Sequence, residues 1–234
     1  MPRPFLEATW RDVIGFTYAV EPARLAPFLP RGAAIDELDG AARVSVVAFE
    51  FADTRLLGRR VWGHVRFPEI NLRFYVRHRG ERAVVFIREL VPRRAVAAVA
   101  RLRYGEPYRR IPMRCGRLPS QGGLRVWHEL GHGARWRMTV DALCASHPPQ
   151  EGTAEHWLTH HALGVGRTRD GRTRVYRVEH PLWALHPLVG WELDVDFGAL
   201  YGAEWAWLDD AEPTHVTLAS GSPVTVHAPR TDGR

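Results

Sequence analysis

Five polar side chains recur at every second position between residues 69 and 77: Glu69, Asn71, Arg73, Tyr75 and Arg77. In an undistorted β-strand these positions share one face. The pattern therefore predicts either a sheet surface that faces solvent or the polar wall of a pocket. In a pocket, Glu69 could act as an acid or a base if burial raised its pKa. The other four residues would bind substrate, and Arg73 or Arg77 could hold a carboxylate through paired hydrogen bonds.

A second polar group follows a predicted helix. Tyr104, Tyr108 and Arg109 lie around Gly105 and Pro107, which favour a fixed turn. In a site, Tyr104 would bind substrate. Tyr108 would donate its hydroxyl to a carbonyl or enolate oxygen, and Arg109 would stabilise negative charge. The alternative is that an aromatic ring and an arginine pack structurally at the end of a sheet.

His180 is a third candidate, just before Pro181 and Trp183. An unperturbed histidine titrates near neutral pH and can therefore carry a proton. We expect the side chain of His180 either to enter the pocket as a catalytic residue or to cap the end of a strand.

Two histidine patterns raise the question of a metal. Residues 128–132 match the zinc-protease motif HExxH, which needs a helix to bring both histidines to one ion. Gly131 and the alternating residues around it indicate a hairpin instead, so we interpret the match as chance. His156 and His160 have the spacing of a helical metal-binding pair, but the sequence identifies no third ligand. We therefore expect no metal and no cofactor.

The elements that would position these residues are mostly short strands. The 234 residues and the hydrophobic fraction of 45% suit one globular domain over residues 1–234. Alternation and turn residues predict strands at residues 5–20, 35–38, 42–51, 69–78, 83–90, 124–130, 134–142, 165–168, 174–180, 191–195 and 216–219, with a loop at 52–64.

Helices are few. They are predicted at residues 21–29, 95–103, 153–159 and 198–201. Thr153 is a candidate N-cap for the third helix. Many strands with hairpin turns and few helices favour an α+β domain, built from a mostly antiparallel curved sheet or β-barrel. The mouth of such a sheet is a natural place for a ligand.

The chain contains no lysine, and all 32 of its positive side chains are arginines. No side-chain amine is therefore available to form a Schiff base. Residues 55–117 hold 17 arginines against four glutamates, a net charge of +13, whereas residues 178–229 hold eight acids and no arginine. Either the two regions neutralise one another, or the basic region holds an anion. Because its arginines are interspersed with predicted strands and are not gathered in a disordered tail, we favour a small anionic ligand over nucleic acid.

Two further features bear on location. The chain has two cysteines, too few for a disulfide scaffold, and it has no apolar run of about 18 residues. The N-terminus does not resemble a signal peptide. We therefore expect a cytoplasmic protein without a membrane partner, and we leave a homo-oligomer open.

Four stretches carry a family resemblance: FPEINLRFYVRH, VAAVARLRYGEPYRRIPM, EHWLTHHALG and YRVEHPLWALHP. In this order they resemble the uncharacterised YqjF-like family, a domain of unknown function, across residues 5–228. That family resembles acetoacetate decarboxylase. The resemblance therefore implies an acetoacetate-decarboxylase-like fold with a few short helices.

The resemblance also implies a comparison of active groups. Tyr108 stands where the decarboxylase has its Schiff-base lysine, and Arg109 where it has the neighbouring lysine. Ala19 stands at the place of a catalytic arginine, and the acidic residue of the third strand is retained as Glu69. Tyrosine cannot form an iminium, and arginine stays protonated. The resemblance implies a pocket, whereas the replacement of both lysines excludes the Schiff-base mechanism.

We hypothesise a pocket protein that binds a carbonyl- or carboxylate-bearing small molecule. An enzyme of this kind would perform lyase-like or other acid–base or enolate chemistry on an oxo acid or related compound. Its catalytic residues would be Glu69, Tyr108, Arg109 and His180. The alternative is a non-enzymatic ligand-binding or sensing module on the same fold. A histidine metalloenzyme ranks third, and a nucleic-acid-binding protein ranks last.

Overall fold

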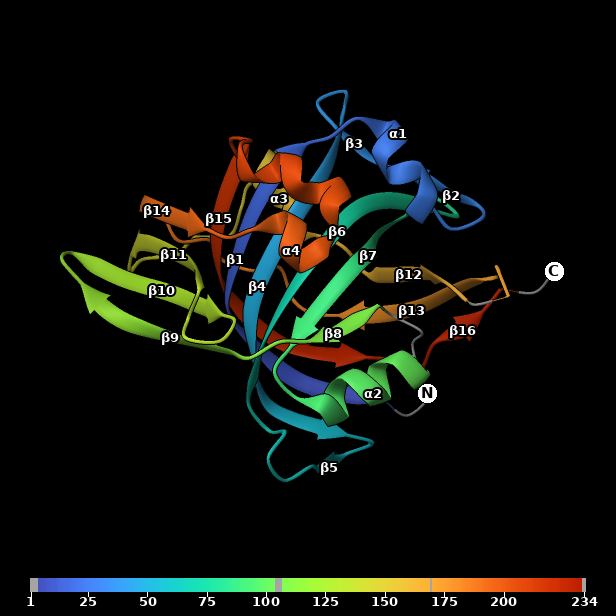
Figure 1. Ribbon diagram of the computed structural model, residues 1–234, viewed down its shortest axis with the longest axis horizontal. Helices are drawn as coiled ribbons and strands as arrows, with labels where there is room; N and C mark the ends of the chain where they lie inside the picture. The colour runs from blue at the N-terminus through green and yellow to red at the C-terminus, as the bar shows by residue number, and fades with distance from the viewer. Residues whose placement is uncertain (1–3, 104–106, 169, 233–234) are drawn as a thin grey trace.

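Strands dominate the protein and form two sheets of unequal size (Figure 1). The computed structural model describes residues 4–103, 107–168 and 170–232. The 12-stranded sheet contains β1 (Leu6–Ala19), β2 (Ala33–Ile35), β3 (Glu37–Leu38), β4 (Ala41–Leu56), β5 (Arg59–Arg60), β6 (Phe67–His78), β7 (Glu81–Val91), β8 (Tyr108–Arg110), β12 (Leu163–Arg167), β13 (Thr173–Glu179), β15 (His215–Val226) and β16 (Arg230–Thr231). The four-stranded sheet contains β9 (Met113–Ser120), β10 (Gly123–Leu130), β11 (Trp136–Leu143) and β14 (Leu188–Asp194).

The larger sheet closes into a ring. Its strands pair in the order β6, β4, β1, β15, β13, β12 and β7, and β7 pairs again with β6. Closure leaves these strands without a free edge. Most neighbours run antiparallel, whereas β8 and β12 run parallel to β7. The prediction of a mostly antiparallel curved sheet with few short helices is confirmed, and the separate four-stranded sheet is an addition to it.

Element boundaries agree in most places. The Asp39-Gly40 hairpin joins β3 to β4, between the strands predicted at residues 35–38 and 42–51. The predicted loop at 52–64 is partly wrong, because β4 extends through Leu56 and β5 pairs with its end. A β-bulge or other irregularity in β1 and a positive φ of 53° at Asp53 let the long strands bend as the ring closes.

The two faces of β6 meet different surroundings. Every residue of β6 except Arg77 is buried, so of the two alternatives for this strand the solvent-facing surface is wrong. Ile70 and Leu72 point out of the ring into the main hydrophobic core. Glu69 and Asn71 alternate with them and point into the ring, where they line a cavity.

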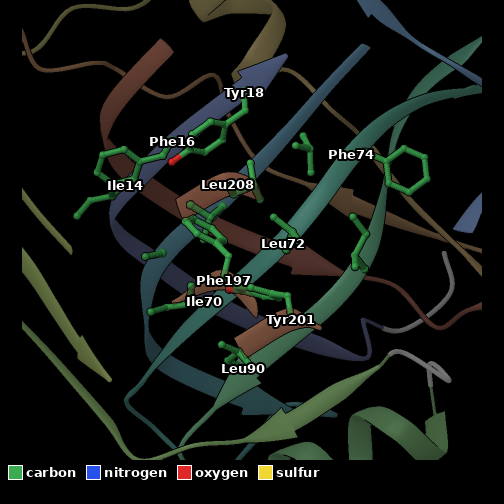
Figure 2. Close-up of a cluster of buried hydrophobic side chains, with 14 of the residues drawn as sticks. Ile14, Phe16, Tyr18, Ile70, Leu72, Phe74, Leu90, Phe197, Tyr201 and Leu208 are labelled. Carbon is green, nitrogen blue, oxygen red and sulfur yellow. The ribbon is translucent and has the colours of Figure 1, made fainter. Parts of the chain in front are cut away.

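The main core lies between the ring and a layer that packs on its outside. Figure 2 shows Phe197 and Tyr201 of α4 (Phe197–Tyr201) against Ile70 and Leu72 of β6. Leu208, from the following 3₁₀ helix η2 (Ala203–Asp209), joins the same cluster. This layer fixes the back of the strand whose other face carries the polar residues.

Three further helical segments complete the fold. They are α1 (Pro22–Leu25), which continues as η1 (Ala26–Phe28), α2 (Arg94–Arg103) and α3 (Ala154–Thr159). Thr153 caps α3 as predicted, since its hydroxyl accepts a hydrogen bond from the His156 amide at 3.3 Å. α2 and α3 lie at opposite ends of the ring (Figure 1). Within the described part of the chain, no helix is long and apolar enough to cross a membrane.

Candidate functional site

An apolar cavity of about 200 Å³ lies inside the ring. Its wall consists largely of hydrophobic side chains, among them Phe49, Phe51, Phe67 and Phe86. One end reaches the surface at Val61, whose side chain is 42% exposed. A mostly apolar wall with a few placed polar groups is the usual composition of a small-molecule site.

Four polar side chains meet on one wall of this cavity: Glu69, Asn71, Glu89 and Tyr108. The Tyr108 hydroxyl donates to Glu69 Oε2 at 3.1 Å. The Asn71 amide donates to Glu69 Oε1 at 3.5 Å. Strand register explains the grouping, because Asn71 lies opposite Glu89 on β7 and Glu89 lies beside Tyr108 on β8.

The sequence analysis does not identify Glu89 as a site residue. It is only 2% exposed, and it also hydrogen-bonds the Tyr108 hydroxyl. A phenol carries one proton and can donate it to only one carboxylate. When Tyr108 bonds both groups, the second carboxyl must therefore bring its own proton. The only sequence signal for Glu89 is a charged residue near the end of an apolar strand.

Burial sets the proton affinities of this group. It raises the pKa of Glu69 from an ordinary 4.5 to about 7, an increase that the hydrogen bonds from Tyr108 and Asn71 oppose. Burial, and then the nearby charges of Glu69 and Glu89, raise the pKa of Tyr108 well above its usual value. Tyr108 is therefore a neutral hydrogen-bond donor, and Glu69 can exchange a proton near neutral pH.

Arg73 lines the same cavity farther along β6. Tyr75 lies beyond it, with the Arg73 guanidinium 5.7 Å from the centre of its ring. The Tyr75 hydroxyl is hydrogen-bonded to Ser45 at 2.7 Å, and Ser45 to Thr17 at 2.7 Å. Tyr75 faces a separate small cavity of about 20 Å³, which Arg73 also lines.

The other predicted residues of these two groups lie elsewhere. Arg77 has a half-exposed side chain and an ion pair with Asp36 at 2.9 Å. Arg109 points away from the cavity and donates to the carbonyl oxygens of Ala199 at 2.9 Å and Leu200 at 3.2 Å. Tyr104 lies outside the described residues. The structure thus brings Glu69, Asn71, Arg73 and Tyr108 to one cavity, and it does not place Tyr75, Arg77 or Arg109 on its wall.

His180 lies near the cavity without lining it. Its ring stacks on Trp183 with centroids 4.4 Å apart, and its Nδ1 lies 2.9 Å from the Pro181 carbonyl oxygen. Burial lowers the pKa of His180, and the charge of Arg73 lowers it further. Trp10, whose ring centroid is 5.9 Å from that of His180, is a cavity residue.

The HExxH match lies on a hairpin, as predicted. β10 carries His128 and pairs with β11 across the turn. His128 is buried, and burial lowers its pKa to about 3, so it is a neutral core side chain. Glu129 forms ion pairs with Arg114 at 2.8 Å and Arg137 at 2.6 Å.

The second histidine pair lies on α3. His160 Nδ1 and His156 Nε2 are 3.2 Å apart on the surface. Within residues 4–103, 107–168 and 170–232, no group of three or more His, Cys, Asp or Glu side chains is placed to hold a metal ion.

Gly164 on β12 makes room for one cavity residue. A Cβ at this position would lie 2.2 Å from Cζ of Tyr176, whose side chain lines the cavity. Gly164→Ala should therefore push the Tyr176 ring into the cavity and destabilise the protein by about 1–3 kcal/mol. Urea unfolding measures this loss. Gly190→Ala on β14 is the matched control, because nothing lies within 4 Å of its Cβ. Equal effects of the two substitutions would contradict the role assigned to Gly164.

Solved enzymes share this fold. Acetoacetate decarboxylase from Legionella pneumophila has a TM-score of 0.66 at 16% identity, over 99% of this chain and 88% of that one. An acetoacetate decarboxylase-like enzyme from Sphingomonas wittichii has a TM-score of 0.65 at 17% identity, over 97% and 92%. The enduracididine biosynthesis enzyme MppR, complexed with the condensation product of pyruvate and imidazole 4-carboxaldehyde, has a TM-score of 0.64 at 15% identity, over 99% and 90%. The predicted acetoacetate-decarboxylase-like fold is confirmed.

Sequence comparison gives the family. No curated protein matches the chain significantly. The profile of DUF2071, described as an uncharacterized conserved protein, matches residues 7–223, which is most of the 234 residues. This match agrees with the predicted relation to a domain of unknown function on the decarboxylase fold. The chain belongs to the DUF2071 family.

Proposed function

We propose that the cavity binds a small carbonyl- or carboxylate-bearing molecule and that Glu69 and Tyr108 exchange a proton with it. The observation that carries this proposal is the 3.1 Å hydrogen bond between Tyr108 and Glu69, buried on the wall of an apolar cavity. MppR, a protein of the same fold, has been solved in complex with pyruvate. That complex supports an oxo acid as the class of ligand.

The chemistry must proceed without a Schiff base, because the chain has no lysine. In its ionised form, Glu69 takes a proton from the carbon next to the ligand's carbonyl group. The C–H electron pair moves into the carbonyl and gives an enolate oxygen. Once Glu69 holds the proton, the Tyr108 hydroxyl is released to donate to that oxygen. Glu69 then trades this proton for one from solvent and returns the solvent proton to the carbon, which completes the exchange. In a ligand with a leaving group on the next carbon, the same enolate expels that group with its electron pair, which is lyase-like chemistry.

Proton exchange gives a direct test of this proposal. The protein is incubated in D₂O with phenylpyruvate, acetoacetate and 3-(4-acetylphenyl)propionate, whose carbonyl group and carboxylate lie at opposite ends of an aromatic body. Loss of the hydrogens next to the carbonyl is followed by proton NMR. We expect saturable exchange, which Glu69→Gln lowers by about 100-fold or more. The rate should rise from about pH 6 to about pH 8, because Glu69, with its pKa of about 7, becomes a base in that range.

Two variants sharpen this test. Tyr108→Phe removes the hydroxyl and should slow exchange while preserving the fold. Arg77→Gln, on the same strand but outside the cavity, should leave exchange unchanged. Saturable binding without exchange would identify a ligand-binding or sensing module instead. Absence of both binding and exchange across the panel would refute the proposed function.

A further inference from the structure

We propose that Arg73 binds the carboxylate of the ligand, and that the ligand is a monocarboxylate with an apolar body lying along β6. This proposal rests on the proposed ligand-binding function of the cavity and names the class of molecule that enters it. It places the carboxylate at the Arg73 end and the reacting carbonyl group at the Glu69 end.

Arg73 is buried without a polar partner. Arg73 is 9% exposed, and within the described residues its guanidinium makes no hydrogen bond or ion pair. An arginine remains charged under all physiological conditions. A buried charge is costly unless it is paired. The cavity that Arg73 lines is where a ligand can supply the missing anion.

The arginines nearest to Arg73 in the sequence have polar partners of their own. Arg66 pairs with Glu50 at 2.6 Å, and Arg77 and Arg82 share the two oxygens of Asp36 at 2.9 and 2.8 Å. Other ion pairs of the basic region use Asp12, Asp53, Glu81, Glu129 and Asp232. No ion pair between described residues joins this region to the acids of residues 178–229. Ion pairs with the acids of that segment therefore do not neutralise the basic region. Arg73 remains available to bind an anionic ligand.

Among the described residues, the groups next to Arg73 are an aromatic ring, hydroxyl groups and histidine rings, none of which is an anion. The aromatic ring of Tyr75 lies 5.7 Å from the guanidinium. The small cavity on the far side is lined by the hydroxyl-bearing side chains of Thr17 and Ser45. The charge of Arg73 also contributes to lowering the pKa of His161 and of His180, so both rings are neutral. This end of the cavity is therefore positive.

The opposite end has the other polarity. Glu69 and Glu89 lie there, and either carboxylate repels an anionic ligand group. Glu69 and Arg73 are four residues apart on one strand, which is about 13 Å along its axis. A ligand that uses both ends therefore has its carboxylate separated from its carbonyl group by an apolar body.

Volume and wall chemistry define that body. An apolar cavity of about 150 Å³ accommodates benzene. The cavity of about 200 Å³ therefore has room for an aromatic or branched group with a short chain. Phe49, Phe67 and Phe86 supply rings against which such a group packs. The carboxylate is the anchoring group, so the bond that reacts lies at the other end of the molecule.

Calorimetric titration with two matched probes tests this assignment. 3-Phenylpropionate carries the carboxylate, and 3-phenylpropionamide is its neutral counterpart. We expect the acid to bind wild-type protein about 10- to 100-fold more tightly than the amide. Arg73→Gln should remove this preference and leave the affinity for the amide unchanged. Arg73→Lys, which keeps the charge without the planar fork, should recover part of the preference.

Arg77→Gln is the control, because Arg77 lies on the same strand with its own partner, Asp36. It should leave both affinities as in the wild type, and thermal unfolding verifies that each variant is folded. If Arg73→Gln does not fold, the comparison of acid with amide on wild-type protein decides. Equal affinities for acid and amide, no acid binding at all, or an acid preference that survives in Arg73→Gln would overturn the assignment.

The outcome is separable from that of the proposed function. If oxo compounds exchange protons in a Glu69-dependent way but acids bind no better than amides, the acid–base proposal stands and the Arg73 assignment fails. If the acid preference depends on Arg73 but Glu69→Gln and Tyr108→Phe leave exchange unchanged, the Arg73 assignment stands and the acid–base proposal fails.

Discussion

Replacing Glu69 by glutamine should make the protein more stable above pH 7. Burial raises the pKa of this carboxyl from 4.5 to about 7, so the folded state favours the protonated form. The stability that Glu69 contributes is fully present below pH 4.5 and is lost as the pH rises through about 7. Above that range the folded state holds a buried carboxylate, at a cost on the order of 3 kcal/mol. Glutamine is neutral at every pH and avoids this cost.

Urea unfolding of the wild type and of Glu69→Gln at about pH 5 and about pH 8.5 measures the effect. The gain in unfolding free energy should appear mainly at the higher pH. Glu129→Gln is the control, for which we expect a change in unfolding free energy of the opposite sign. Its hydrogen bonds and ion pairs with Arg137 and Arg114 lower the pKa of Glu129, so that substitution should destabilise the protein at about pH 8.5. A change for Glu69→Gln that is equal at both pH values would show that the carboxyl is not buried as described.

The free-energy cost of burying the ionised Glu69 carboxylate is informative about function. A carboxyl group that destabilises the fold near neutral pH is difficult to explain by structure alone. Strongly shifted carboxyls concentrate in sites where they transfer protons. The expected result, a more stable protein with lower exchange activity, is the trade-off that a functional residue produces. The same substitution therefore tests stability and chemistry together.

The alternation in residues 69–77 predicts much of the site, because side chains on a strand repeat every two residues. This rule places Glu69, Asn71 and Arg73 on one wall. It does not show where the cavity ends. Tyr75 lies beyond that end, and Arg77 reaches the surface and Asp36. How far a pocket extends along a strand depends on the elements that pack against that strand. Here Trp157 of α3 packs on Tyr75, with ring centroids 4.5 Å apart.

The same rule separates Tyr108 from Arg109. Sequence interpretation treats both as site residues that follow a turn. In the structure they lie on the short strand β8, where neighbouring side chains point to opposite sides. Tyr108 enters the cavity, while Arg109 bonds carbonyl oxygens of α4. The strand exists because it pairs with β7, a contact that the local sequence does not reveal.

The position of Glu89 in the site depends on a bulge in β7. The hairpin register begins with His78 opposite Glu81 and, if unbroken, would place Arg88 opposite Asn71. An extra residue near Ile87 shifts the register, so that Glu89 lies opposite Asn71 instead. A shift of one residue exchanges the two faces of a strand. The sequence contains the residues of the carboxyl pair, but the bulge that brings them together is a property of the packed sheet.

Leu72→Ala should lower the free energy of unfolding by about 2–5 kcal/mol. Leu72 is fully buried on the outer face of β6, in the same cluster as Phe197 and Tyr201 of α4 (Figure 2). The substitution removes apolar contacts and leaves a cavity that the surrounding strands cannot fill completely. Urea unfolding at about pH 6 measures the loss, with Leu118→Ala as the control. Leu118 is 54% exposed, so its replacement should change stability by about 0.5 kcal/mol or less.

The comparison of Leu72→Ala with Arg73→Gln separates the two faces of one strand. Leu72 supports the outer core, and Arg73 faces the cavity. At temperatures where Leu72→Ala remains folded, its affinity for 3-phenylpropionate should stay within about twofold of the wild type, because neighbouring side chains on a strand lie on opposite faces. Loss of binding in a folded Leu72→Ala protein would show that the outer core sets the position of Arg73. Unchanged stability would show that α4 does not pack on β6. The cavity chemistry therefore depends on a strand whose stability comes from its opposite face.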